Sequence, residues 1–148
     1  MSNDLPRIGI GTDHAGFEYK EFLRETLKAM GYTVEDFGTY SRESVDYPVF
    51  IKPTARAVAE GSCDLGIVLG GSGNGEAMSA NKVTGIRCAL CWDANTGRLA
   101  RQHNDANMIS LGQRQISRET ALDTVLAWLN AEFEGGRHQH RIDLIETA

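Results

Sequence analysis

The segment DLGIVLGGSGNGEAMSANK, residues 64–82, combines an apolar run, a glycine-rich loop and a short helical stretch. Residues 65–69 are almost entirely apolar, which is typical of a parallel strand that helices cover on both faces. The loop holds four glycines in residues 70–75, and glycines neither fill a core nor favour a regular element. We therefore expect a buried strand whose end lets another group approach the backbone, followed by a helix over about 76–83.

Strand-like and helix-like segments alternate along the rest of the chain. The expected strands are 7–12, 32–37, 64–70, 86–92 and 107–112, and the expected helices are about 18–30, 48–60, 76–83, 94–103, 118–133 and 137–146. The strand 32–37 is more polar and is expected at an edge. This alternation predicts an α/β fold with one domain over 1–148, a doubly wound, Rossmann-like three-layer α/β/α sandwich with a five-stranded parallel sheet.

Composition narrows the range of partners and compartments. The net charge of −5 argues against a nucleic-acid partner, which would require a basic face. No apolar run approaches the ~18 residues needed to cross a bilayer, and the first residues lack the pattern of a signal peptide. We therefore expect a cytoplasmic protein that binds neither nucleic acid nor membrane.

The cysteines Cys63, Cys88 and Cys91 do not form a disulfide framework in a chain of this kind. The pair Cys88 and Cys91 has the spacing of some metal and redox sites, but both lie in a strand-like run where they would face opposite sides. No second cysteine or histidine pair has zinc spacing. Small buried apolar side chains are the favoured interpretation, and a redox protein is a distant alternative.

The glycine-rich loop offers consecutive backbone N–H groups that end at a helix N-terminus, which is a concave site for negative charge. The simpler interpretation is a tight turn. Glu76, directly after the loop, either complements the helix dipole or acts as a base if burial raises the pKa of its carboxyl group. The residues alone leave both interpretations open.

Other polar residues have both structural and functional interpretations. Asp13 and His14 follow the first strand at the same sheet edge, where Asp13 could serve as an N-cap. His103 could complement a helix C-terminus, and Asn104 could form a turn. Arg114 and the cluster RHQHR, residues 137–141, could be solvated surface, although such a small positive cluster on an acidic protein also suits a small anion.

Five motifs occur in order along nearly the whole chain. They are GTDHAGFEYK (11–20), VDYP (45–48), GGSGNGE with ANK (70–76 and 80–82), RQHND (101–105) and GGRHQHR (135–141). Together they resemble the type B ribose-5-phosphate isomerase family, which also contains galactose-6-phosphate and allose-6-phosphate isomerases.

The resemblance implies an aldose–ketose isomerase that works through a cis-enediolate without metal or cofactor. In that mechanism Glu76 would move the proton between C1 and C2. One branch of the family has a catalytic cysteine just before the loop, and here that position is Gly70, so the chain resembles the glutamate branch. Asp13 and His103 would open the furanose ring, with His103 as the proton donor.

The resemblance also implies a set of substrate contacts. The amides of the loop, Gly71, Ser72, Gly73, Asn74 and Gly75, would hold the enediolate oxygens. The sugar or its phosphate would be bound by Asp13, His14, Asn104, Arg114, Arg137 and Arg141. Tyr47 and His138 match the motifs and are expected to line the pocket. For His140, a place in the pocket and a place on the surface both remain open. Arginine suits phosphate because its fork matches two oxygens at once.

The resemblance implies the conversion of ribose 5-phosphate to ribulose 5-phosphate. The alternatives are the same chemistry on a tetrose or hexose phosphate, and a non-catalytic sugar-phosphate or nucleotide sensor. Because the helix 94–103 runs antiparallel to the strands and is ~16 Å long, His103 lies too far from Glu76 of its own chain. If both residues serve one site, that site lies between the subunits of a homodimer, or of a tetramer.

Overall fold

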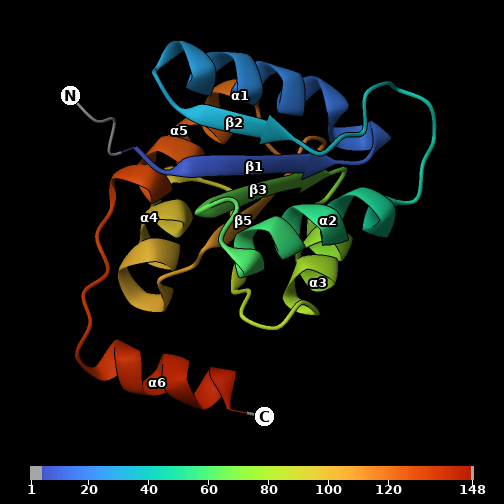
Figure 1. Ribbon diagram of the computed structural model, residues 1–148. Coiled ribbons are helices and arrows are strands. Elements are labelled where there is room, and N and C mark those ends of the chain that lie inside the picture. The colour runs from blue at the N-terminus through green and yellow to red at the C-terminus, as the bar shows by residue number, and fades with distance from the viewer. Residues whose placement is uncertain (1–4, 148) are drawn as a thin grey trace.

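A parallel sheet forms the centre of the structure, a computed structural model that describes residues 5–147 (Figure 1). Within those residues the strands are β1 Arg7–Thr12, β2 Thr33–Asp36, β3 Leu65–Gly70, β4 Cys88–Leu90 and β5 Met108–Gly112, in the spatial order β2-β1-β3-β5-β4. All pairings are parallel, which confirms the predicted five-stranded sheet and places β2 at an edge. The chain leaves β1 towards β2 on one side and returns to β3 on the other, so the order reverses between β1 and β3.

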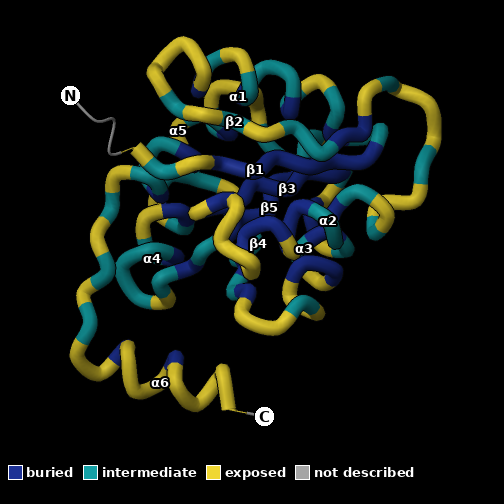
Figure 2. The backbone as a smooth tube through the Cα atoms, in the orientation of Figure 1, coloured by how far each residue is buried: buried dark blue, intermediate teal, exposed yellow. Residues whose placement is uncertain are grey.

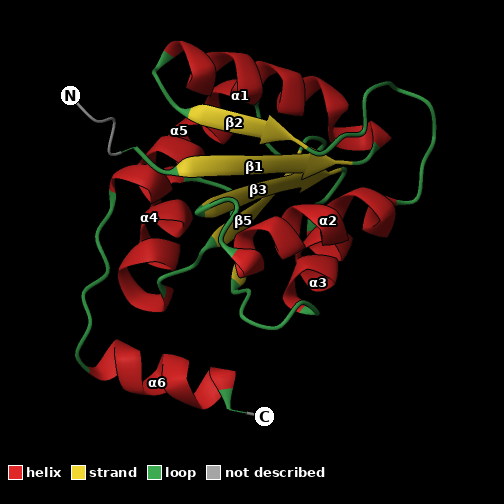
Figure 3. Cartoon of the chain, viewed as in Figure 1, coloured by secondary structure: helices red, strands yellow, loops and turns green. Residues whose placement is uncertain are grey.

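Helices cover both faces of the sheet (Figure 3). They are α1 Phe17–Ala29, α2 Tyr47–Glu60, α3 Asn74–Asn81, α4 Ala94–Asn104, α5 Arg118–Asn130 and α6 Arg137–Glu146, and a 3₁₀ turn, His14–Gly16, precedes α1. One apolar core contains residues of α1, α4 and α5, and a second contains residues of α2 and α3. This arrangement confirms the predicted doubly wound sandwich, in which ligands bind beyond the carboxyl ends of the strands at the reversal point.

The two cores explain why β3 is apolar throughout. Leu65, Ile67 and Leu69 belong to the core with α1 and α5, whereas Val68 belongs to the core with α2 and α3. Because side chains alternate along a strand, Gly70 at the end of β3 lies on the same face as Val68. The last residue of the strand therefore faces α3.

Most element boundaries lie within one residue of the prediction, and three elements differ by more. The helix α3 begins at Asn74, and β4 is Cys88–Leu90. Just before β4, the side chain of Asn107 accepts the N–H of Arg87. The helix α5 ends at Asn130, so Phe133 lies outside it. The chain turns there because the N–H of Glu134 donates to the carbonyl of Gln102 in α4 at 3.0 Å.

The helix α6 lies apart from the sheet, beyond an extended segment that follows α5 (Figure 2). It contacts α4, and its buried residues are His138 and Ile142. Leu144 and Ile145 are about 60% exposed on the same helix. None of the helices in residues 5–147 is long and apolar enough to span a membrane.

Candidate active site

Glu76 stands in the first turn of α3 and is only 4% exposed. Its carboxyl group lies directly against Gly70, because a Cβ added at Gly70 would overlap the carboxyl carbon and both oxygens of Glu76. The carboxyl end of β3, at the reversal point of the sheet, therefore carries a buried carboxyl group.

Burial raises the pKa of the Glu76 carboxyl group, and the charge of Asp13 raises that pKa further. The backbone N–H groups of Glu76 and Gly73 oppose this effect, but the net direction is upward. Both effects considered from the sequence thus act on the pKa of Glu76, and burial outweighs the backbone N–H groups at the start of the helix. A carboxylate with a raised pKa is a better general base near neutral pH.

The glycine-rich loop is fixed against the end of β5. The N–H groups of Gln113 and Arg114 donate to the carbonyls of Gly70 and Gly71 at 2.8 and 3.0 Å, and the Ser110 hydroxyl donates to the carbonyl of Gly73 at 2.7 Å. Gly73 caps α3 with a φ of 87°, a left-handed conformation that favours glycine. These bonds hold the loop backbone rigidly beside Glu76.

Not all five loop amides are equally placed to hold a ligand. The N–H of Asn74 donates to the hydroxyl of Ser72 at 3.2 Å, and the N–H of Gly73 contributes to lowering the Glu76 pKa. Ser72 and Asn74 are both exposed, whereas Gly73 is buried. Two N–H groups of the loop are therefore already used within the protein: that of Gly73 acts on the Glu76 carboxyl group, and that of Asn74 stabilises the turn.

Asp13 has the structural role considered for it, and it also lies near Glu76. Its carboxylate accepts the N–H groups of Ala15 and Gly16 at 2.9 and 3.2 Å, so it is the N-cap of the 3₁₀ turn. It is also 7% exposed and close enough to influence the charge of Glu76. The N-cap contacts fix the orientation of a carboxylate that faces the site.

Three further predicted residues lie at this edge of the sheet. His14 is half-buried, and its Nδ1 accepts the N–H of Val45 at 3.1 Å, which leaves Nε2 as the N–H donor of the neutral ring. A Cβ added at Gly71 would lie 3.2 Å from Nη1 of Arg114, so Arg114 extends over the loop. The ring of Tyr47, at the start of α2, lies against Gly75.

The remaining predicted residues lie elsewhere. Asn104 ends α4, and its carbonyl accepts the Nε–H of Arg87, the residue before β4 begins. His103 is next to it, and the exposed Arg137 and Arg141 are on α6. These residues are thus near the amino ends of the strands, whereas Glu76 is at the carboxyl ends, about 20 Å away along a six-residue strand. A single chain does not bring the two groups together.

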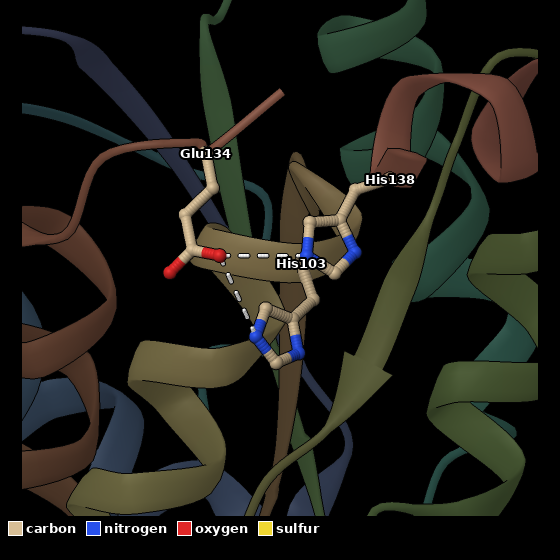
Figure 4. Close-up of side chains that lie close together, drawn as sticks. All are labelled: His103, Glu134 and His138. Carbon is tan, nitrogen blue, oxygen red and sulfur yellow. Dashed lines mark ion pairs between the residues drawn. The ribbon is translucent and has the colours of Figure 1, made fainter. Parts of the chain in front are cut away.

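The residues near the amino ends of the strands include a contact that was not predicted from the sequence. The rings of His103 and His138 stack with centroids 4.4 Å apart, and Glu134 lies beside both (Figure 4). Glu134 was not singled out, although an acidic residue four positions before His138 was a signal for a contact with that histidine.

The cysteines do not form a metal or redox site. Cys91 belongs to the core with α1 and α5, and Cys88 to the core with α2 and α3, so the two thiols face opposite sides as predicted. Burial raises the pKa of both thiols, to about 12 for Cys91. Burial also raises the pKa of Cys63. Protonated thiols are poor nucleophiles and poor ligands.

The sequence profile described as Ribose/Galactose Isomerase matches residues 8–145. The chain is 43% identical over 141 residues to ribose-5-phosphate isomerase B of Escherichia coli, covering 95% of each chain. It is 47% identical over 142 residues to the Mycobacterium leprae enzyme of the same name, covering 94% of this chain and 87% of that one.

Solved structures agree with this similarity. Ribose-5-phosphate isomerase B of Clostridium thermocellum superposes with a TM-score of 0.94 at 50% identity, covering 95% of each chain. The Mycoplasma genitalium enzyme, determined with bound ribulose-5-phosphate, has a TM-score of 0.91 at 42% identity and covers 95% of this chain and 93% of that one. The chain therefore belongs to the ribose/galactose isomerase family, a family of aldose–ketose isomerases.

Proposed function

We propose that this enzyme interconverts ribose 5-phosphate and ribulose 5-phosphate, with Glu76 as the base. The observation that carries the proposal is the buried carboxyl group of Glu76, which has a raised pKa and lies beside the glycine-rich loop at the reversal point of the sheet. The relative from Mycoplasma genitalium, determined with bound ribulose-5-phosphate, supports a pentose phosphate as the substrate.

The proton transfer proceeds in two balanced steps. The Glu76 carboxylate removes the proton from C2 of the open-chain aldose, and the C–H electron pair forms the double bond of a cis-enediolate. The protonated Glu76 then returns the proton to C1, while a proton moves between the two oxygens, and this gives the ketose. Backbone N–H groups of the loop stabilise the negative charge that develops on those oxygens.

The ring must open before this transfer. Asp13, fixed by its two backbone contacts, accepts the proton of the anomeric hydroxyl as the C1 carbonyl forms. His103 donates a proton to the ring oxygen as the bond between that oxygen and C1 breaks. Both residues are then restored by exchange with water.

The phosphate is held by Arg137 and Arg141 with His14. Arginine forks form paired hydrogen bonds to phosphate oxygens, which fix the far end of the sugar. Arg114 extends over the loop and contacts the substrate near the reacting carbons.

The active site is completed by a second subunit. Glu76 and Asp13 lie at the carboxyl ends of the strands, whereas His103, Arg137 and Arg141 lie on α4 and α6 near the amino ends. A homodimer that places α4 and α6 of one chain over the glycine-rich loop of the other forms two such sites. A tetramer made of two such dimers keeps the same sites.

An assay of the purified protein on four-, five- and six-carbon aldose phosphates tests the proposal. We expect the highest kcat/KM on ribose 5-phosphate, and a fall of at least ~10²-fold in kcat for Glu76→Gln, because a positioned base contributes that much. Glu119→Gln is the matched control, since Glu119 is also in the first turn of a helix but is exposed. Binding without turnover of any of these sugars would instead identify a sugar-phosphate sensor.

A further inference from the structure

Three potential metal ligands lie together: His103, Glu134 and His138 (Figure 4). They are near the amino ends of the strands, away from Glu76 of the same chain. The ligand atoms lie within 4.8 Å of one another, and a Glu134 carboxylate oxygen is 3.8 Å from Nε2 of His103 and 3.4 Å from Nε2 of His138. The three residues come from the end of α4, the segment before α6, and α6 itself. The fold therefore assembles this cluster from separate segments.

His138 provides a second, independent observation. Its side chain is 9% exposed, and its buried Nε2 has no hydrogen-bond partner among residues 5–147, since Glu134 is near but not aligned for a hydrogen bond. A buried imidazole nitrogen without a hydrogen-bond partner is unfavourable, because it has lost its hydrogen bonds to water and has not replaced them. A ligand at this point would satisfy it.

The chemistry of the cluster suits a divalent transition metal. Two imidazoles and a carboxylate are a ligand set that zinc uses, with bonds of about 2.0–2.2 Å and a fourth position left open. Tetrahedral bonds of that length place ligand atoms about 3.3 Å apart, close to the 3.4 Å between Glu134 and His138. The two rings are 12° from parallel, so His103, whose side chain is 39% exposed, must rotate out of the stack to share the ion.

We propose that His103, Glu134 and His138 form a binding site for Zn²⁺, and that the bound ion inhibits isomerisation. The second part rests on the proposed function, in which His103 donates a proton to the ring oxygen. An imidazole nitrogen bound to zinc has no free electron pair to carry that proton. The ion thus occupies a catalytic group without taking part in the reaction.

Binding is measured first, because it does not depend on any activity. Full-length protein freed of metal competes for Zn²⁺ with a coloured chelator. We expect one strong site per chain, weakened in Glu134→Gln and His138→Asn by at least the ~10–100-fold that the loss of a supporting ligand contact costs. The matched controls Glu132→Gln and His140→Asn change exposed residues of the same segment and should bind as the wild type does.

The use of two test variants also excludes a folding artefact. Glu134 is exposed, so Glu134→Gln leaves the core intact even if His138→Asn reduces stability. Absence of a strong site, or equal binding by all four variants, would overturn the metal site.

Inhibition is measured second, with each variant compared with its own activity in the absence of zinc. One equivalent of Zn²⁺ should abolish most wild-type activity, a chelator should restore it, and Glu134→Gln should keep at least half of its activity at the same zinc concentration. Wild-type protein that binds zinc with full activity would overturn the inhibitory role. If no sugar phosphate is isomerised at all, the proposed function fails, while the binding measurement still decides the metal site.

Discussion

The carboxyl group of Glu76 occupies the space beside Gly70 that any side chain at position 70 would need. A side chain at position 70 and the present orientation of Glu76 therefore exclude one another. The resemblance to the family places the catalytic cysteine of another branch at this same position. A chain that uses Glu76 in this orientation requires glycine there.

Gly70→Ala should consequently displace Glu76 with little effect on the fold, because the overlapping group is the end of a flexible side chain. We expect kcat to fall by about 10²-fold, the typical effect of misplacing a catalytic group by about 1 Å. Thermal unfolding should change little. The double variant Gly70→Ala with Glu76→Gln should be no slower than Glu76→Gln alone, since both changes remove the same group. Wild-type kcat in Gly70→Ala would contradict the assigned position of the base.

The raised pKa of Glu76 predicts a pH-dependent stability difference. The native state binds the Glu76 proton more tightly than the unfolded state does. Ionisation of Glu76 therefore destabilises the fold as the pH rises above 4.5, the ordinary pKa of a glutamate side chain. Glu76→Gln removes this effect. The variant should therefore gain stability relative to wild type as pH rises above about 4.5, as measured by urea unfolding. A stability difference that is constant or moves the other way would show that burial does not dominate at Glu76.

The fold could be predicted because its strongest signals are local. The apolar run 65–69 and the helical stripe of α5 follow directly from covering a parallel sheet on both faces. The end of α5 at Asn130 falls three residues before the expected end, and beyond it the N–H of Glu134 bonds to the carbonyl of Gln102 in α4. Just before β4, Arg87 likewise bonds to the side chain of Asn107, which follows much later in the sequence.

The sequence predicts which residues lie at the carboxyl ends of the strands, but it does not predict whether burial or the helix dipole dominates the pKa of Glu76. Sequence placed Glu76 at a helix start, where the dipole lowers a pKa and burial raises it, and only packing against Gly70 shows that burial dominates. The contact of Glu134 with His103 was not predicted because it joins two segments that are far apart in the chain. Such contacts depend on how α6 lies on α4.

Arg137→Ala and Arg141→Ala should chiefly weaken the binding of phosphorylated sugar and of inorganic phosphate. A lost charged hydrogen bond costs about 1.5–3 kcal/mol, which corresponds to roughly 10- to 150-fold in KM. Both side chains are exposed in the single chain, so the fold should be unaffected. Gln139→Ala on the same helix is the control. An unchanged KM in both arginine variants would place these residues on the bare surface.

Activity should survive treatment with a strong chelator, because proton transfer by Glu76 and His103 uses no ion. It should also survive the replacement of Cys63, Cys88 and Cys91 by alanine, apart from losses that follow reduced stability. All three thiols are buried, and burial raises their pKa values, so none is a ready nucleophile. Kinetic assays and thermal unfolding of each variant separate the two effects. Reversible loss of activity on chelation would show that the proposed mechanism is wrong.

The central claim is that Glu76 of one chain and His103 of another form one active site. Two inactive proteins, Glu76→Ala and His103→Ala, are mixed under conditions that exchange subunits, and exchange is confirmed with a mass label. In a two-fold dimer each mixed pair holds one doubly damaged site and one intact site, and random exchange makes half of the dimers mixed. Activity should therefore return to about one quarter of the wild-type value. If exchange is complete and no activity returns, Glu76 and His103 do not act together across a subunit interface.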